Sequence, residues 1–418
     1  MTQQAPRASG STDLSRRQFI ARAGALGALA IGGSSILAAC GSSGSASGGG
    51  GRTVKIGFIA LTDSAPVIMA KELGYYAERG VEVEVLKQAS WPALRDALLA
   101  GDIDAAHCLS SMPFSVATGI SGTRTQRLPI AMILSNNGQG ITLKSDYSAA
   151  GYGDLAGVRK ALAKRGTTLA MTYPGGTHDT WLRYWLLAAG VPGDSVEIIP
   201  IPPPQMVANM KVGTMDGYSV GEPWNAVAVK EGIGFTAIAS QDIWRHHPEK
   251  ALVVNPDFAT SRQSELEAVM GAVLAACKWL DVPANRAKAA TTISAAAYVN
   301  APAKEIEGRM LGNYELGAGL GAKSFPDDHM LFHRDGATNV PRHRDAIWFM
   351  TQFQRFGLLK KAPDYHGIAE DLILRDLYEK VAKAEGVAIP DDDMAPFTVE
   401  LDGARFDPNT PRQEASRA

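Results

Sequence analysis

Residues 168–178 read TLAMTYPGGTH, and this stretch decides the fold class. Its first four residues have the length and character of a buried strand, and the two glycines then interrupt the pattern. From His178 onward, apolar residues recur at helical spacing, at Trp181, Leu182, Trp185 and Leu186. A strand, a glycine-rich loop and a helix in this order predict one βα unit of an α/β protein.

The same order of elements occurs twice along the chain. In the first copy we expect strands at 55–59, 81–85 and 102–106, with the helices between them closed by Gly80 and Gly101. In the second copy we expect strands at 168–171, 196–199 and 214–218, with helices closed by Gly190 and Gly213. The equivalent glycines are 110 and 112 residues apart, so two βαβαβ units repeat at a nearly constant offset.

Two such units predict an α/β protein of two doubly wound lobes that face each other across a ligand cleft. Parallel strands joined by helices place the loops that follow them at one edge of each sheet, where they would line the cleft. The expected cleft loops are 62–66, 88–91 and 108–113 in one lobe, and 173–178, 200–205 and 220–224 in the other. We expect the first lobe to comprise residues 52–143 and 251–390, the second 144–250, and a polar, extended tail 391–418.

The first 51 residues differ in composition from the rest. Arg16 and Arg17 stand in a segment that resembles a twin-arginine export signal, and an apolar stretch rich in Gly and Ala follows. Small residues precede Cys40 as in a bacterial lipobox, which predicts that Cys40 is lipidated. We therefore expect a signal peptide over residues 1–39 and a flexible Gly/Ser tether over 40–51, because the apolar stretch is too short and glycine-rich to span a membrane well.

Composition excludes some functions. The chain has 418 residues, 45% of them hydrophobic, and a formal net charge of -2, so it lacks the concentrated basic face that nucleic acid requires. No nucleophile elbow, phosphate-binding loop or metal-ligand spacing is present in the sequence. We expect Cys108 and Cys277 to be buried free thiols, although an oxidising compartment would also allow them to pair.

Several residues in the expected cleft loops and crossing segments could hold an anion. Gly176 would let backbone N–H groups approach a ligand at a helix start, with Thr177 as the N-cap and His178 as a side-chain donor. Trp91 has an indole N–H that donates and cannot accept, although packing is the commoner role of a tryptophan.

The remaining candidates come from later segments. Gln139 lies in a polar, glycine-flanked stretch that would also suit a plain turn. Gly221 can present its backbone N–H closely, and the neighbouring Glu222 would orient a donor or cation rather than touch an anion. Lys250 offers a full counter-charge, although it would also suit the surface flank of a strand.

The longest of these runs carry a resemblance. They read THD at 177–179, PPPQMVANMKVG at 202–213, VGEPWN at 220–225 and HPEKAL at 247–252. Together they resemble the solute-binding proteins of nitrate and bicarbonate ABC importers and are close to the nitrate-binding branch. The similarity covers nearly the whole chain after the leader. The resemblance implies a type II periplasmic-binding-protein fold, a monomer, and an ABC permease and ATPase as partners. It also implies that nitrate is held by Trp91, Gln139, His178, Gly221 and Lys250.

Nitrate is planar and accepts hydrogen bonds only, so a set of donors with one cation favours it, and nitrite meets the same criteria. Bicarbonate is the alternative within the family; its O–H needs an acceptor, and that branch is associated with bound calcium. Without bicarbonate we expect no cofactor and no metal. Some proteins on this fold are enzymes of thiamine-precursor synthesis, which is the alternative from a different class.

Overall fold

The computed structural model of the protein describes residues 52–122, 126–163 and 166–417. The expected export signal at Arg16 and Arg17, the lipidation site Cys40 and the tether 40–51 lie outside the described residues. Among those that are described, no helix is both long and apolar enough to cross a membrane.

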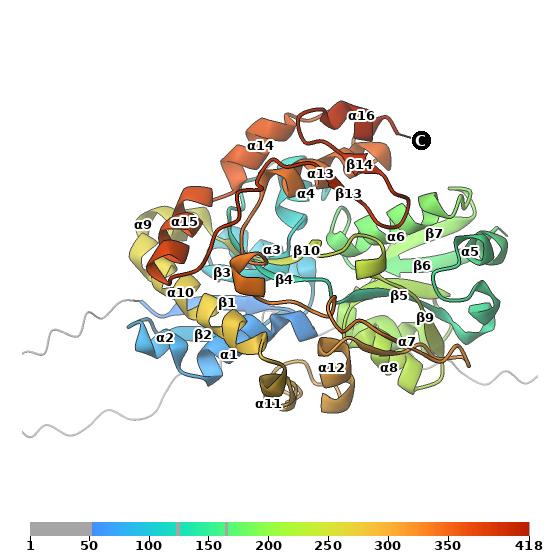
Figure 1. Ribbon diagram of the computed structural model, residues 1–418, viewed down its shortest axis with the longest axis horizontal. Helices are drawn as coiled ribbons and strands as arrows, with labels where there is room; N and C mark the ends of the chain where they lie inside the picture. Colours follow the sequence, from blue (N-terminus) through green and yellow to red (C-terminus); the bar gives the residue numbers. More distant parts are fainter. Residues whose placement is uncertain (1–51, 123–125, 164–165, 418) are drawn as a thin grey trace, which may run out of the picture. The chain divides into compact units, whose positions relative to one another are not determined.

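Two five-stranded mixed sheets organise the described residues (Figure 1). The first has the order β2 (Val83–Lys87), β1 (Val54–Phe58), β3 (Ala105–Leu109), β10 (Pro248–Val254) and β4 (Ile130–Asn136). The second has the order β7 (Val196–Pro200), β6 (Thr167–Met171), β8 (Gly217–Gly221), β5 (Gln139–Lys144) and β9 (Gly234–Ala239).

The internal repeat is confirmed by matching strand pairs. Strand β1 pairs in parallel with β2 and β3, and β6 pairs in parallel with β7 and β8. The registers correspond as well, since Gly57 lies opposite Ala106 and Ala170 lies opposite Tyr218. In each sheet the fourth strand then runs antiparallel to its neighbour, β10 against β3 and β5 against β8. The predicted α/β fold with two lobes is therefore confirmed.

Helices fill the connections and cover the sheets. In the two repeats they are α1 (Ala65–Glu72), α2 (Tyr75–Glu78), α3 (Trp91–Ala100), α6 (Thr177–Ala188) and α7 (Met206–Lys211), with α4 (Met112–Ala117), α5 (Leu155–Leu162) and α8 (Trp224–Lys230) alongside. The later helices are α9 (Pro256–Ser261), α10 (Gln263–Leu280), α11 (Pro283–Ile293), α12 (Ala303–Met310), α13 (His343–Arg355), α14 (Tyr365–Leu372), α15 (Arg375–Ala384) and α16 (Pro411–Ala415). Short hairpins join β11 (Asn313–Glu315) to β12 (Ala322–Ser324) and β13 (Phe397–Thr398) to β14 (Arg405–Phe406).

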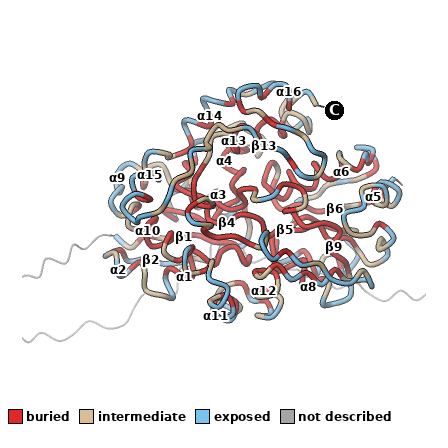
Figure 2. Tube along the Cα trace, in the orientation of Figure 1, coloured by how far each residue is buried: buried red, intermediate tan, exposed pale blue. Residues whose placement is uncertain are grey.

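The core follows the apolar pattern of the strands and of the long helix α10. Every residue of β3, β4 and β10 is buried, as expected for strands covered on both faces (Figure 2). Helix α10 packs against α1 and α15 through buried residues that include Val269, Val273 and Leu274. Cys277 lies on the same helix and Cys108 on β3; both are buried and free, which confirms the prediction for the two thiols.

The lobe boundaries differ from those expected from the sequence. Residues 139–143 belong to β5 in the second sheet, and residues 248–250 belong to β10 in the first. Both apolar runs were recognisable as strands, but hydrogen-bonded pairing with β8 and β3 decides which sheet each one joins. The chain crosses at Asn137 and at His246, both with positive φ, and Asn137 Oδ1 accepts a hydrogen bond from the His246 N–H at 3.0 Å.

The expected extended, polar tail, residues 391–418, is partly folded. The segment forms the β13–β14 hairpin and α16, which packs on α13. Phe406 is 1% exposed, and the Tyr184 hydroxyl donates to Asp402 at 2.9 Å. The apolar residues here are too widely spaced to show a period, so their burial against other elements was not recognisable from the sequence.

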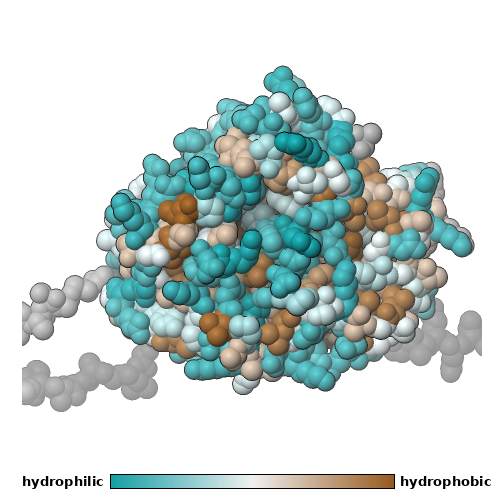
Figure 3. Space-filling view, in the orientation of Figure 1, coloured by the Kyte–Doolittle hydropathy of each residue, from teal (hydrophilic) through white to brown (hydrophobic). Residues whose placement is uncertain are grey.

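The surface is polar where it faces water. On the face shown in Figure 3, hydrophobic residues are scattered among hydrophilic ones. Among the described residues, the large hydrophobic side chains that are exposed are Leu187, Val212 and Val282. Isolated apolar side chains of this kind are normal on a monomeric protein.

Because Phe406 is buried, we expect Phe406→Ala to reduce the free energy of unfolding by about 3–5 kcal/mol. Denaturant unfolding would measure the change. The exposed Gln413, in the same tail, provides the control: Gln413→Ala should stay within about 0.5 kcal/mol of the unchanged protein. Equal stability of the two variants would contradict a packed tail.

Candidate functional site

The site is built where the cleft loops of the two lobes meet. Trp91 is the first residue of α3, His178 the second residue of α6, and Gln139 begins β5. Gly221 ends β8, and Lys250 is the third residue of β10. The side chains of Trp91, Gln139, His178 and Lys250 are each 0% exposed.

Short distances connect these residues across the two sheets. The ring centroids of Trp91 and His178 are 6.4 Å apart, and Lys250 Nζ lies 5.9 Å from the Trp91 centroid. Gln139 Nε2 donates to Thr177 Oγ1 at 3.3 Å, and Thr177 Oγ1 donates to Glu249 Oε1 at 2.7 Å. Groups from both lobes, chosen from separate segments of sequence, thus belong to one buried cluster.

Lys250 does not carry a free counter-charge, contrary to the sequence interpretation. Its ammonium lies 2.8 Å from Asp63 Oδ2 and 2.6 Å from Glu249 Oε1. Burial alone would lower the pKa of Lys250, but the two carboxylates raise it above its ordinary value. The lysine is therefore charged, and its positive charge is paired with two buried carboxylates.

The two carboxylates differ in their surroundings. Burial would raise the pKa of Asp63, but Lys250 and His107, whose Nε2 is 2.8 Å from Asp63 Oδ1, hold it below its ordinary value. Burial raises the pKa of Glu249 to about 7 despite the neighbouring Lys250. Glu249 is thus the carboxylate whose charge changes near neutral pH.

Several buried side-chain atoms of the cluster have no hydrogen-bond partner among the described residues, and Trp91 Nε1 and His178 Nε2 are two of them that can donate. The other ring nitrogen of His178 is hydrogen-bonded to Thr172. Burial, together with Lys250, keeps the pKa of His178 well below its ordinary value, so the imidazole is neutral and can donate from one nitrogen. Buried donors without partners are costly, and these two lie close together, with ring centroids 6.4 Å apart, so one bound ligand could accept from both.

The predicted roles of Gly176 and Thr177 need correction. Gly176, not Thr177, occupies the N-cap position of α6, and its N–H already donates to the Tyr173 carbonyl at 2.9 Å. A Cβ on Gly176 would lie 2.6 Å from Leu109, so close packing between the lobes requires this glycine. The Thr177 hydroxyl points to Glu249 and helps to position that carboxylate.

Gly221 and Glu222 follow one another at the end of β8, and Gly221 lies close to Asp63. A Cβ on Gly221 would approach Leu61 to 3.2 Å and Asp63 Oδ2 to 3.5 Å, so a side chain there would press on the ion pair. Glu222 Oε1 is 3.5 Å from Arg309 Nε, which agrees with the expectation that this carboxylate orients a cation.

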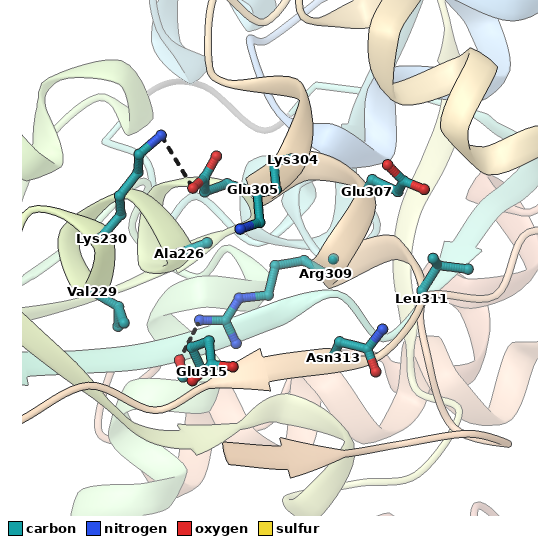
Figure 4. A pocket seen from close by; sticks show the side chains of 11 residues that line it. Ala226, Val229, Lys230, Lys304, Glu305, Glu307, Arg309, Leu311, Asn313 and Glu315 are labelled. Carbon is teal, nitrogen blue, oxygen red and sulfur yellow. Dashed lines mark hydrogen bonds and ion pairs between the residues drawn. The ribbon is translucent and has the colours of Figure 1, made fainter. Parts of the chain in front are cut away.

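Arg309 also lines a separate surface cavity of 490 Å³ near α8 and α12 (Figure 4). In that cavity Lys230 pairs with Glu305 at 3.2 Å, and Arg309 Nη2 donates to the Glu315 carbonyl at 3.3 Å. None of the ligand residues expected from the sequence lines it, so we assign the candidate site to the buried cluster.

Asp63, His107 and Glu249 were missed by sequence reasoning. Asp63 lies in the first expected cleft loop and Glu249 directly precedes Lys250, so position alone could have suggested both. His107 stands beside Cys108 with no metal-ligand spacing around it, so the sequence gives no signal for it. In the described part of the chain, no group of His, Cys, Asp and Glu could hold a metal ion. The ammonium of Lys250 already occupies the space between the two carboxylates.

Comparison with known proteins assigns the family. Residues 48–294 match the model of the NMT1-like family. The chain is 35% identical to the nitrate/nitrite binding protein NrtA of a Nostoc species, over 96% of this chain and 98% of the relative. The chain belongs to the NMT1-like family.

Two further comparisons refine this relationship. The crystal structure of the periplasmic nitrate-binding protein NrtA from Synechocystis matches with a TM-score of 0.83 and 37% identity, over 87% of this chain and 97% of that one. The bicarbonate-binding protein CmpA of Synechococcus elongatus is 30% identical over 86% of this chain and 85% of its own length. The expected resemblance and the two-lobed fold are both confirmed for this NMT1-like chain.

Because Lys250 is the buried cation that pairs with both Asp63 and Glu249, we expect Lys250→Met to reduce the free energy of unfolding by about 3–5 kcal/mol. Denaturant unfolding would test this, and adding Asp63→Asn should restore part of the loss. Lys211 forms an exposed ion pair with Glu231 and provides the control. Lys211→Met should hardly change the free energy of unfolding, because exposed ion pairs contribute little to it. Unchanged stability of Lys250→Met would show that the buried network does not support the fold.

Proposed function

We propose that this protein captures nitrate or nitrite in the buried site between its lobes and delivers it to an ABC importer. The observation that carries the proposal is the donor set: Trp91 Nε1 and His178 Nε2 are buried without partners beside the charged Lys250. A planar anion that only accepts hydrogen bonds would satisfy these donors. The nitrate/nitrite binding relatives, similar over nearly the whole chain, support the same ligand.

The proposal places the protein outside the cytoplasm. The relative of known structure is periplasmic, and the leader of this chain carries Arg16, Arg17 and Cys40 in export and lipidation patterns. We propose a lipid-anchored monomer in the cell envelope that binds rather than transforms its ligand. The positive φ values at Asn137, Gly138 and His246 fit hinge motion at the crossings, with the closed form docking on a permease that its ATPase drives.

Bicarbonate remains the second candidate for one specific reason. Gln139 Oε1 is buried without a partner in the part of the chain that the structure describes, and it is an acceptor that the bicarbonate O–H could use. The relation to a bicarbonate-binding protein at 30% identity supports the same alternative.

Calorimetry with nitrate, nitrite and bicarbonate, the last with and without calcium, separates the candidates. We expect about micromolar binding of nitrate, because charge-assisted hydrogen bonds contribute about 1.5–3 kcal/mol each and three of them, from Trp91, His178 and Lys250, could reach roughly 8 kcal/mol. Bicarbonate binding that depends on calcium, together with no heat from nitrate, would reject the nitrate assignment.

Trp91→Phe tests the donor directly. The variant keeps an aromatic ring but loses the indole N–H, so nitrate affinity should fall by about tenfold to a hundredfold. Trp185 is the matched control, because its Nε1 is also buried without a partner among the described residues, at a site away from the cluster. A Trp185→Phe variant should bind nitrate normally; an equal loss in both variants would remove Trp91 from the site.

A further inference from the structure

The buried site has an unfavourable charge balance for an anion. It contains one cation, Lys250, held between the carboxylates of Asp63 and Glu249, and all three side chains are 0% exposed. With both carboxylates ionised, the three groups carry one net negative charge. An incoming anion would add a second one, and buried like charges repel strongly.

The other ionisable groups around the cluster do not correct this balance. Burial raises the pKa of Glu222 although Arg309, 3.5 Å away, opposes the shift; when Glu222 is ionised, the two groups contribute no net charge. Burial lowers the pKa values of His107, His178 and His247, so these imidazoles are neutral at pH 7. The nearby His246 has a lowered pKa as well and faces Asp328, which is also paired with Arg245.

Glu249 has the geometry to accept a proton. Its Oε1 is hydrogen-bonded by Thr177 and Lys250, while its Oε2 accepts from Trp181 Nε1 at 3.1 Å. His247 Nδ1 lies 3.5 Å from the same Oε2 and has no hydrogen-bond partner among the described residues. Because His247 Nε2 is engaged with Ser240 Oγ at 2.8 Å, a donating Nε2 leaves a lone pair on Nδ1 that can accept from a protonated Glu249.

Asp63 lacks these properties. Its Oδ1 is bonded by His107 and its Oδ2 is paired with Lys250, and both groups hold its pKa below the ordinary value against the effect of burial. Glu249, by contrast, has its pKa raised by burial to about 7. Of the two carboxylates, Glu249 is the one that can lose its charge under ordinary conditions.

We propose that the anion-bound site carries a proton on Glu249, beside His247, so that when Glu249 is ionised in the free protein it takes up one proton with each anion captured. The inference rests on the proposed function. The proton comes from solvent and forms a bond to Glu249 Oε2, which faces the His247 Nδ1 lone pair at 3.5 Å. The three charges of the site then sum to zero before the anion is counted, and Lys250 is left to balance Asp63. Release of the ligand returns both the anion and the proton.

The direction of the pH effect follows from the protonation state of the empty site. Below pH 7 Glu249 is already protonated, so nitrate binds without proton uptake; above pH 7 each binding event must bring a proton. We expect the nitrate Kd to rise about tenfold between pH 6 and pH 8, as follows from a group that titrates near pH 7. At pH 8, nearly one proton should be taken up per nitrate bound.

Titration calorimetry of the unchanged protein with nitrate, in Tris and in HEPES at pH 8, measures the proton uptake from the difference in buffer ionisation heat. Glu249→Gln cannot ionise, so its nitrate affinity should be independent of pH and its proton uptake zero. Glu231 provides the matched control, because its carboxylate is in an exposed pair with Lys211 and Glu231→Gln should keep the full pH dependence. Should Glu249→Gln fail to fold, His247→Leu removes the acceptor and should move the midpoint of the pH profile to lower pH.

The outcomes separate the two proposals. Nitrate binding with no proton uptake and a flat pH profile in the unchanged protein would overturn the proton proposal and leave the proposed function standing. A pH profile that persists in Glu249→Gln would place the proton elsewhere, for example on His178, and would overturn the assignment to Glu249. No nitrate binding at any pH would overturn the proposed function itself.

Discussion

The ion triad of Asp63, Lys250 and Glu249 is the constraint on which the rest of the site depends. Taking charges out of water costs several kcal/mol for each ion, so a buried lysine persists only with closely placed carboxylates. The first lobe supplies all three groups, but the second lobe completes their hydrogen bonds through Thr177 and Trp181. The two lobes therefore meet around a polar centre, and its geometry fixes how the apolar strands on either side must approach.

This arrangement also explains the character of the site. A tryptophan and a neutral histidine give directional donors without adding charge, while the charge of Lys250 is already committed to carboxylates. In the proposed mechanism, affinity for an anion depends on the protonation state of Glu249 as well as on the number of hydrogen-bond donors. A site of this kind discriminates by hydrogen-bond type and by charge together.

Much of the fold could be predicted from the sequence because local signals and global architecture agree. The repeat from Gly80 to Gly190 specified the two βαβαβ units, and the loops after the strands contained Trp91, His178 and Gly221. The features that could not be predicted depend on contacts between residues far apart in the sequence. Sequence could not show that β5 joins the second sheet, that Phe406 is buried, or that Lys250 is matched by Asp63, 187 positions earlier. From sequence alone, a carboxylate in a loop is expected to be exposed, because the buried cation that pairs with it cannot be identified.

The late position of β10 in the sequence has a consequence for the order in which the two lobes can fold. Every strand of the second sheet lies within residues 139–239, whereas the first sheet lacks the strand between β3 and β4 until residues 248–254 are available. The late strand, β10, is also the one that carries Glu249 and Lys250. A chain emerging from the ribosome can thus complete its second lobe early, but it has no lysine to offer an anion until the first lobe closes. The seven residues of β10 thus complete the first sheet and supply two of the three charged groups of the binding centre.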